Sequence, residues 1–183
     1  TQPCADGITG VIPFDSHPWE ALKFQRLAEQ TGKRIHVHLE LVRNQEGQRQ
    51  IDDACTARQV AEAVLVAQQS PGIQIFMEPL VDHDRGYFPR NGLIDRRGSP
   101  RAAHKVWVHL GRLLKPGDVT LLSSNPRVFQ TPVGVVYLDG SQLPPTKVED
   151  ETVINLVTGQ VQARPSTMQS PLLVWTAQMN AES

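Results

Sequence analysis

Between residues 8 and 114 the chain alternates three times between a short apolar run and a segment of helical periodicity. The apolar runs are Ile8–Phe14, Arg34–Val42 and Ile73–Met77, and the pattern repeats about every 35–40 residues. The last helix is expected to open at Ser99, with Pro100 in its first position. Strands that alternate with helices indicate βαβ units, so the sequence predicts an α/β fold with a parallel sheet.

The pattern changes after Gly117. Short apolar runs follow one another, separated by turn-forming residues, with no long helical stretch between them, at residues 119–122, 133–138, 152–157 and 172–176. Strands of this spacing are typical of small all-β modules. The sequence therefore predicts two parts: a (β/α) part over residues 1–116 and an antiparallel β-sandwich accessory domain over residues 117–183.

Composition excludes several classes of partner. The net charge of −1 gives no reason to expect a nucleic acid, because domains that bind one usually carry a basic face. No apolar run approaches the roughly 20 residues that cross a bilayer, so we expect a soluble protein and no membrane partner. The compartment stays open, secretion or a periplasmic location included. Cys4 and Cys55 are too few for a disulfide framework and match no zinc motif, and their redox state is left undecided.

The segment Arg34–Val42 shows the most regular alternation in the chain. Ile35, Val37 and Leu39 point to one side, and His36, His38 and Glu40 to the other. In a closed parallel barrel the polar set would point inward, with Glu40 nearest the end where active sites form. The alternative is a half-exposed antiparallel strand whose polar residues face water.

Polar residues also follow the third strand. Glu78 ends it, and together with Glu40 it would supply the two carboxylates that glycoside hydrolysis uses. Alternatively, Glu78 accepts hydrogen bonds from arginines of the next loop and only holds that loop. Within nine positions this loop carries six side chains able to form hydrogen bonds: Asp82, His83, Asp84, Arg85, Tyr87 and Arg90.

A metal site is a further possibility. His36 and His38 lie on one face of a strand, and Glu40 or the loop carboxylates could add ligands. No third ligand has a diagnostic spacing. No phosphate-binding glycine motif and no Gly-x-Ser-x-Gly elbow is present, and we expect no cofactor.

The segment Gly92–Ala103, with the sequence GLIDRRGSPRAA, resembles the turn before the last helix in (β/α)8-barrel glycoside hydrolases of the large retaining clan, clan A. The resemblance covers residues 8–114 and implies that these are the last three βα units of a barrel. A β-sandwich after the barrel is common in such enzymes. The strand that ends at Glu40 would be the seventh, which makes Glu40 the candidate nucleophile.

The resemblance also implies a retaining reaction on an oligo- or polysaccharide. The acid/base glutamate of the clan usually follows an asparagine on the fourth strand, and this chain has no Asn-Glu pair, so that residue would lie outside it. A second polypeptide or a missing N-terminal segment would complete the barrel. Sugar contacts are expected from His38, Glu78, Asp82, Arg85 and Tyr87. The alternatives are a non-catalytic carbohydrate-binding or scaffold protein on the same fold, and a metal-dependent hydrolase or isomerase that uses His36 and His38.

Overall fold

The structure of the 183-residue chain is a computed structural model. It describes residues 7–13, 17–41, 53–70, 72–82, 92–114, 119–124, 127–139, 143–144, 151–165 and 171–176. The described part contains no helix that is long and apolar enough to cross a membrane.

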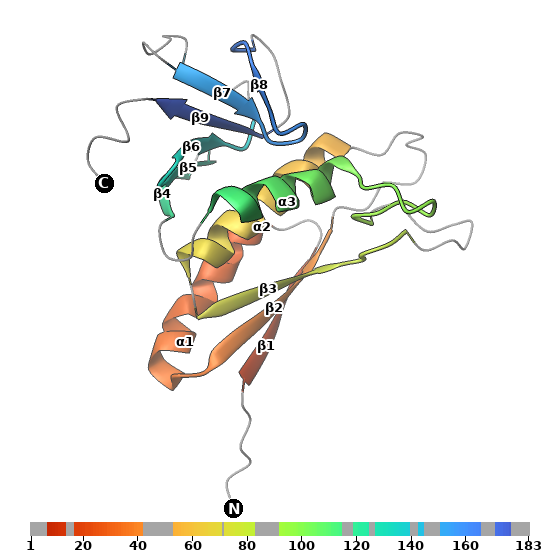
Figure 1. The fold of residues 1–183 in the computed structure, drawn as a ribbon. Coiled ribbons are helices and arrows are strands. Elements are labelled where there is room, and N and C mark those ends of the chain that lie inside the picture. Colours follow the sequence, from red (N-terminus) through yellow and green to blue (C-terminus); the bar gives the residue numbers. More distant parts are fainter. Residues whose placement is uncertain are drawn as a thin grey trace, which may run out of the picture.

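The first part of the chain is a three-stranded parallel sheet with helices between its strands (Figure 1). The sheet has the order β1-β2-β3. The elements in chain order are β1 (Gly7–Ile12), the 3-10 helix η1 (Pro18–Phe24), α1 (Gln25–Thr31), β2 (Arg34–Glu40), α2 (Asp53–Gln69), β3 (Ile73–Glu78) and α3 (Ala102–Leu113). The predicted α/β alternation and the parallel pairing are confirmed.

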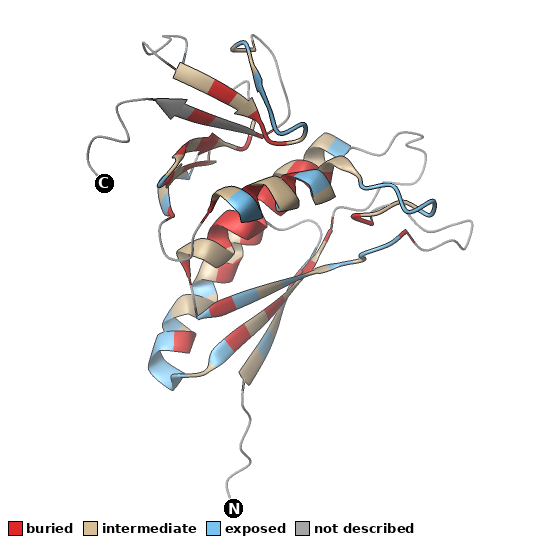
Figure 2. Cartoon of the chain, in the orientation of Figure 1, coloured by how far each residue is buried: buried red, intermediate tan, exposed pale blue. Residues whose placement is uncertain are grey.

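The helices cover one face of this sheet. Ile35, Val37 and Leu39 of β2 are fully or almost fully buried, while the residues between them are half-buried, so the predicted alternation of β2 is confirmed. All three helix-bearing segments contribute to the buried cluster on this side of the sheet. The other face carries half-buried and exposed residues (Figure 2).

The structure shows where the first and the last helical segments begin. The first is a 3-10 helix up to Phe24 and α-helical only from Gln25, and it ends at Gly32, which has φ +63°. The last helix begins at Ala102 rather than after Ser99. Pro100 pairs with Ile94 and the Arg101 N–H donates to the Leu93 carbonyl (3.0 Å), so this stretch is held extended and the helix cannot start earlier.

The second part is one antiparallel sheet of six strands with the order β4-β5-β6-β9-β7-β8. The strands are β4 (Thr120–Ser124), β5 (Arg127–Thr131), β6 (Gly134–Tyr137), β7 (Glu151–Asn155), β8 (Gln160–Gln162) and β9 (Leu172–Thr176). The predicted sandwich is therefore corrected: the described strands form a single sheet. It packs against helices instead of a second sheet, because α2 and α3 lie between it and the parallel sheet (Figure 1).

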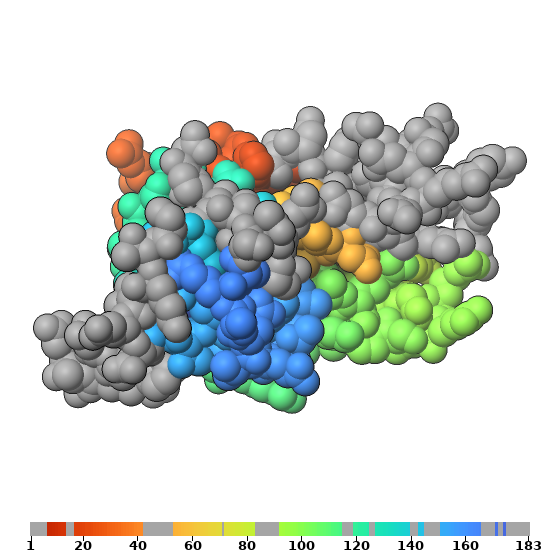
Figure 3. Space-filling model, turned by 90° about the horizontal axis from the view of Figure 1, so that it is seen from above, coloured from red at the N-terminus to blue at the C-terminus, as the bar shows by residue number. Residues whose placement is uncertain are grey.

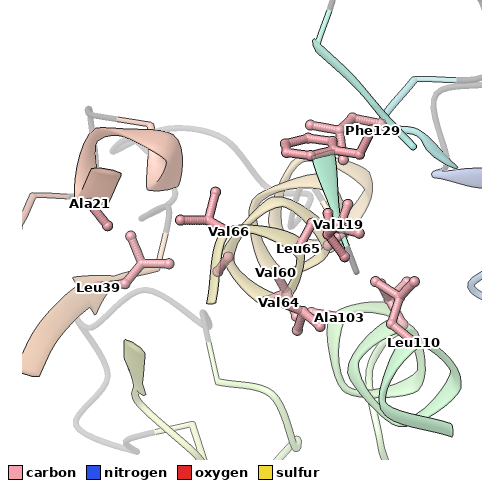
Figure 4. Close-up of a cluster of buried hydrophobic side chains, with 14 of the residues drawn as sticks. Ala21, Leu39, Val60, Val64, Leu65, Val66, Ala103, Leu110, Val119 and Phe129 are labelled. Atoms are coloured by element: carbon pink, nitrogen blue, oxygen red, sulfur yellow. The ribbon is translucent and has the colours of Figure 1, made fainter. Parts of the chain in front are cut away.

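Helix α2 is the centre of the molecule. An uninterrupted run from Gln59 to Val66 is buried, so the helix has no solvent-facing stripe over this stretch. Figure 4 shows Val66 directed towards Ala21 and Leu39, while Leu65 lies near Val119 and Phe129. One continuous cluster thus joins the parallel sheet to the β-sheet part. The predicted boundary at residues 116 and 117 lies outside the described residues and stays a prediction.

Polar contacts reinforce this apolar layer. The Arg58 guanidinium pairs with Asp139 (2.8 Å), and His109 Nδ1 lies 2.7 Å from the Leu156 carbonyl oxygen. Viewed from above, the strands of the second part adjoin α3 (Figure 3). A further contact involves the buried Glu62, whose Oε1 accepts a hydrogen bond from the Trp19 N–H (3.0 Å) and whose Oε2 lies 3.1 Å from Arg127 Nε. Glu62 on α2 therefore links η1 to β5.

The buried position of Glu62 predicts a pH dependence of stability. Burial raises the pKa of Glu62, and this effect outweighs the attraction of Arg127. A raised pKa means that the folded state binds more protons, so stability falls as pH rises above about 4.5, by at most about 1.4 kcal/mol per unit. We expect the free energy of unfolding of the wild type, minus that of Glu62→Gln, to decrease with rising pH in urea titrations.

Glu20→Gln is the matched control for this experiment. Glu20 lies at the surface with its side chain 31% exposed, and its hydrogen bond to Lys23 lowers the pKa of its carboxyl. Its contribution to stability is therefore lost as pH falls below about 4.5, which is opposite to the pH dependence expected for Glu62. If the free energy of unfolding of the wild type minus that of Glu62→Gln stays constant or rises between about pH 4.5 and 7, the raised pKa of Glu62 would be contradicted.

Candidate active site

The candidate site lies on the face of the parallel sheet that the helices leave uncovered. The residues on this face come from alternate positions of all three strands: Thr9, Val11, His36, His38, Glu40, Gln74, Phe76 and Glu78. All of them are half-buried or exposed. Parallel sheets are usually covered on both faces. A polar face of this kind, open to solvent in the described chain, therefore indicates a surface with a further use.

Glu40 and Glu78 are neighbours on this face. They are register partners at the last positions of β2 and β3, so their Cα atoms are one strand spacing apart, about 4.8 Å. The main chain around Glu40 is fixed from two sides. Gln59 Nε2 on α2 donates to the Glu40 carbonyl oxygen (3.0 Å), and the Leu41 N–H donates to the Glu78 carbonyl oxygen (3.3 Å). Glu40 and Glu78 are thus neighbouring carboxylates on a backbone that is held by these hydrogen bonds.

Phe76 organises the histidines beside these glutamates. Its ring stacks on His38, with centroids 5.5 Å apart and an interplanar angle of 21°, and it meets the His36 ring edge-on at 5.4 Å. His38 Nδ1 lies 3.9 Å from Glu78 Oε1, an ion-pair distance when the imidazole is protonated. Phe76 was not among the predicted site residues, although its parity with Glu78 on β3 was enough to place both on one face.

The two histidines do not complete a metal site in the described part of the chain. No group of three histidine, cysteine, aspartate or glutamate residues able to hold a metal is found among the described residues. Both imidazole rings pack on Phe76 instead. The metal alternative through His36 and His38 thus remains a prediction that the described residues do not supply with a third ligand.

Asp82 occupies a structural position. Its side chain is 2% exposed; Oδ1 accepts from the Gly92 N–H (2.8 Å) and Oδ2 from Arg101, which also reaches Asp53 (3.4 Å). A Cβ at Gly92 would lie 2.5 Å from the Asp82 backbone nitrogen, so this approach requires glycine. Asp82 thus joins the end of β3 to the start of α3. The predicted contacts Arg85 and Tyr87 lie outside the described residues.

No protein-family model and no curated protein matches the sequence. The fold is similar to that of a solved structure. It is a family 39 glycoside hydrolase from the gut symbiont Bacteroides cellulosilyticus WH2, with a TM-score of 0.51 and 14% identity. The match covers 87% of this chain and 37% of the hydrolase chain, so this chain spans little more than a third of that protein's length. The likeness shows a glycoside hydrolase-like fold.

The structural role of Asp82 can be tested by mutation. Asp82→Ala leaves Arg101 and the Gly92 N–H without their buried acceptor, and we expect a loss of about 3 kcal/mol in the free energy of unfolding. Asp53→Ala is the matched control, because it removes the half-exposed partner of the same arginine and should cost less than about 1 kcal/mol. Equal losses for the two variants in urea unfolding would refute the assignment.

Proposed function

We propose that this chain is the carboxyl-terminal part of a retaining glycoside hydrolase built on a (β/α)8 barrel, with Glu40 as its nucleophile. The observation that carries the proposal is the pairing of Glu40 with Glu78 at the carboxyl ends of two parallel strands, on the face that none of the described helices covers. Active-site residues of such barrels lie at this end of the strands. The likeness to a family 39 glycoside hydrolase supports the same fold.

The uncovered face supports an incomplete barrel. In a closed barrel it would point to the interior, where His36, His38 and Glu40 would be enclosed together with Thr9, Gln74 and Phe76. Three strands cannot close this space. We therefore infer that polypeptide outside this sequence supplies the remaining strands, either as a longer chain or as a second one.

The chemistry assigned to Glu40 is attack on the anomeric carbon of the sugar. Its carboxylate oxygen forms a bond to that carbon while an acid protonates the departing glycosidic oxygen, and water later hydrolyses the glycosyl-enzyme. The acid would come from the part of the barrel outside this chain, with carboxyl groups about 5–5.5 Å apart. Glu78 is not assigned this role, because adjacent strand ends place it beside Glu40 rather than across the sugar.

The neighbours of Glu40 would bind the substrate. Glu78 and His38 lie on the same face and can accept or donate hydrogen bonds to sugar hydroxyls. Asp82 is not proposed as a sugar contact, because its two carboxylate oxygens are already bound by the Gly92 N–H and by Arg101. Arg85 and Tyr87 remain candidate contacts.

The proposal is tested on the complete gene product with a panel of aryl glycosides of pentoses and hexoses. Glu40→Gln should lower kcat by about 10³-fold or more while leaving the fold intact, since the amide cannot act as the nucleophile. Activated 2-deoxy-2-fluoro glycosides of the sugar that is turned over should trap the intermediate, and peptide mass spectrometry should find the sugar on Glu40.

Glu20→Gln, on the surface of η1, is the control and should keep wild-type activity. Wild-type turnover by Glu40→Gln, or a label on another residue, would remove Glu40 as the nucleophile. Sugar binding without turnover in the wild type would favour the non-catalytic carbohydrate-binding alternative.

A further inference from the structure

We propose that Gln59 is a positioning residue for Glu40, and that the antiparallel sheet acts on Glu40 through it by holding the adjacent Arg58. This inference rests on the proposed function and adds to it a role for the second part of the chain in the reaction. The two residues that carry it follow one another on α2.

Gln59 is a polar residue in a buried, otherwise largely apolar stretch of α2. Its relative exposure is 6%, and from here to Val66 the only other polar residue of the helix is Glu62. A buried amide destabilises a protein unless it is hydrogen-bonded, and Gln59 Nε2 donates to the Glu40 carbonyl oxygen (3.0 Å). An apolar side chain would fill this space without that requirement, so the amide indicates a use at Glu40.

The hydrogen bond from Gln59 holds the peptide unit that follows Glu40. The carbonyl of this unit accepts from Gln59, and its N–H, which belongs to Leu41, donates to the Glu78 carbonyl oxygen (3.3 Å). Because a peptide unit is planar, contacts to its carbonyl and its N–H together fix its orientation. Helix α2 and strand β3 therefore set the direction in which the backbone presents the Glu40 side chain.

The neighbouring residue of α2 is bound to the antiparallel sheet part. Arg58 Nη1 lies 2.8 Å from Asp139 Oδ2, and 28% and 18% of these two side chains are exposed. Consecutive helix residues point about 100° apart, so Arg58 and Gln59 reach different layers from the same turn. Val66, two turns after Gln59, is directed towards Leu39 on the parallel sheet (Figure 4). The rotation of this turn about the helix axis is thus fixed by the antiparallel sheet on one side and by the candidate site on the other.

Kinetics of the complete gene product test the role of Gln59. Gln59→Met keeps an unbranched side chain of similar length and removes the donor. We expect kcat to fall about 10-fold or more while KM stays within about 2-fold of the wild type, because the alignment of Glu40 is lost and the sugar contacts are not.

Ser70→Ala is the matched control. Ser70 is also buried, and its Oγ donates to Gln25 Oε1 (3.2 Å) just after the end of α2, so the variant removes a side-chain donor that does not contact Glu40. It should lower the Tm and leave kcat unchanged. Wild-type kcat in Gln59→Met, or an equal loss of kcat in Ser70→Ala, would overturn the positioning role.

A double-mutant cycle tests the part taken by the antiparallel sheet. Asp139→Ala removes the partner of Arg58 and should lower kcat about 3-fold or more in the wild type but not further in Gln59→Met, because it acts through the Gln59 amide. Its effect on the Tm should be the same in both backgrounds. An equal fall of kcat in both backgrounds, or no fall in either, would overturn the link between this sheet and Glu40.

Hydrogen exchange separates this inference from the proposed function. The Leu41 amide, followed by fragmentation mass spectrometry, should exchange about 10-fold or more faster in Gln59→Met than in the wild type or Ser70→Ala. A fluoroglycoside label on Glu40, with unchanged kcat and unchanged Leu41 exchange in Gln59→Met, would retain the proposed function and overturn the positioning role. Faster Leu41 exchange in a protein that carries the label on another residue would refute Glu40 as the nucleophile and uphold the hold of Gln59 on its peptide unit.

Discussion

The structure depends on the burial of the central part of α2, residues 59–66, between two sheets. A polar group buried there needs a hydrogen-bond or charge partner, and Glu62 is the charged side chain of this stretch. Its two oxygens are held by the Trp19 N–H on η1 and by Arg127 on β5. The parallel sheet, the helices and the antiparallel sheet thus share one core, in which the β-sheet part provides a wall for the helices.

This burial determines where a site can form. Because α2 and α3 cover one face of the parallel sheet, the other face is left with the residues of opposite parity, and these include Glu40, His38, Phe76 and Glu78. The Glu40 backbone is also held by the helix layer, because Gln59 on α2 donates to its carbonyl oxygen. The described chain therefore combines a helix-covered sheet with a polar surface on the opposite face.

Local patterns predicted part of this arrangement. The parity of β2 follows from strict alternation, so the face on which Glu40 lies was predictable. Contacts between segments that are distant in the sequence could not be predicted from local patterns. The pairing of Glu62 with Arg127 and of Asp82 with Arg101 joins residues whose spacing has no periodicity. The sandwich was predicted from strand spacing alone, which cannot tell whether a sheet packs on a second sheet or on helices. β5 and β8 were overlooked for the related reason that short strands next to tight turns carry little pattern.

In the proposed function, Glu40 faces the interior of a barrel completed by other polypeptide. A crystal structure of the complete gene product would give the distance from the Glu40 carboxylate to the nearest glutamate or aspartate carboxylate supplied from outside this chain. We expect about 5–5.5 Å across an enclosed cavity, as retention requires. A Glu40 side chain exposed on an open sheet, or no such carboxylate within about 9.5 Å, would contradict it.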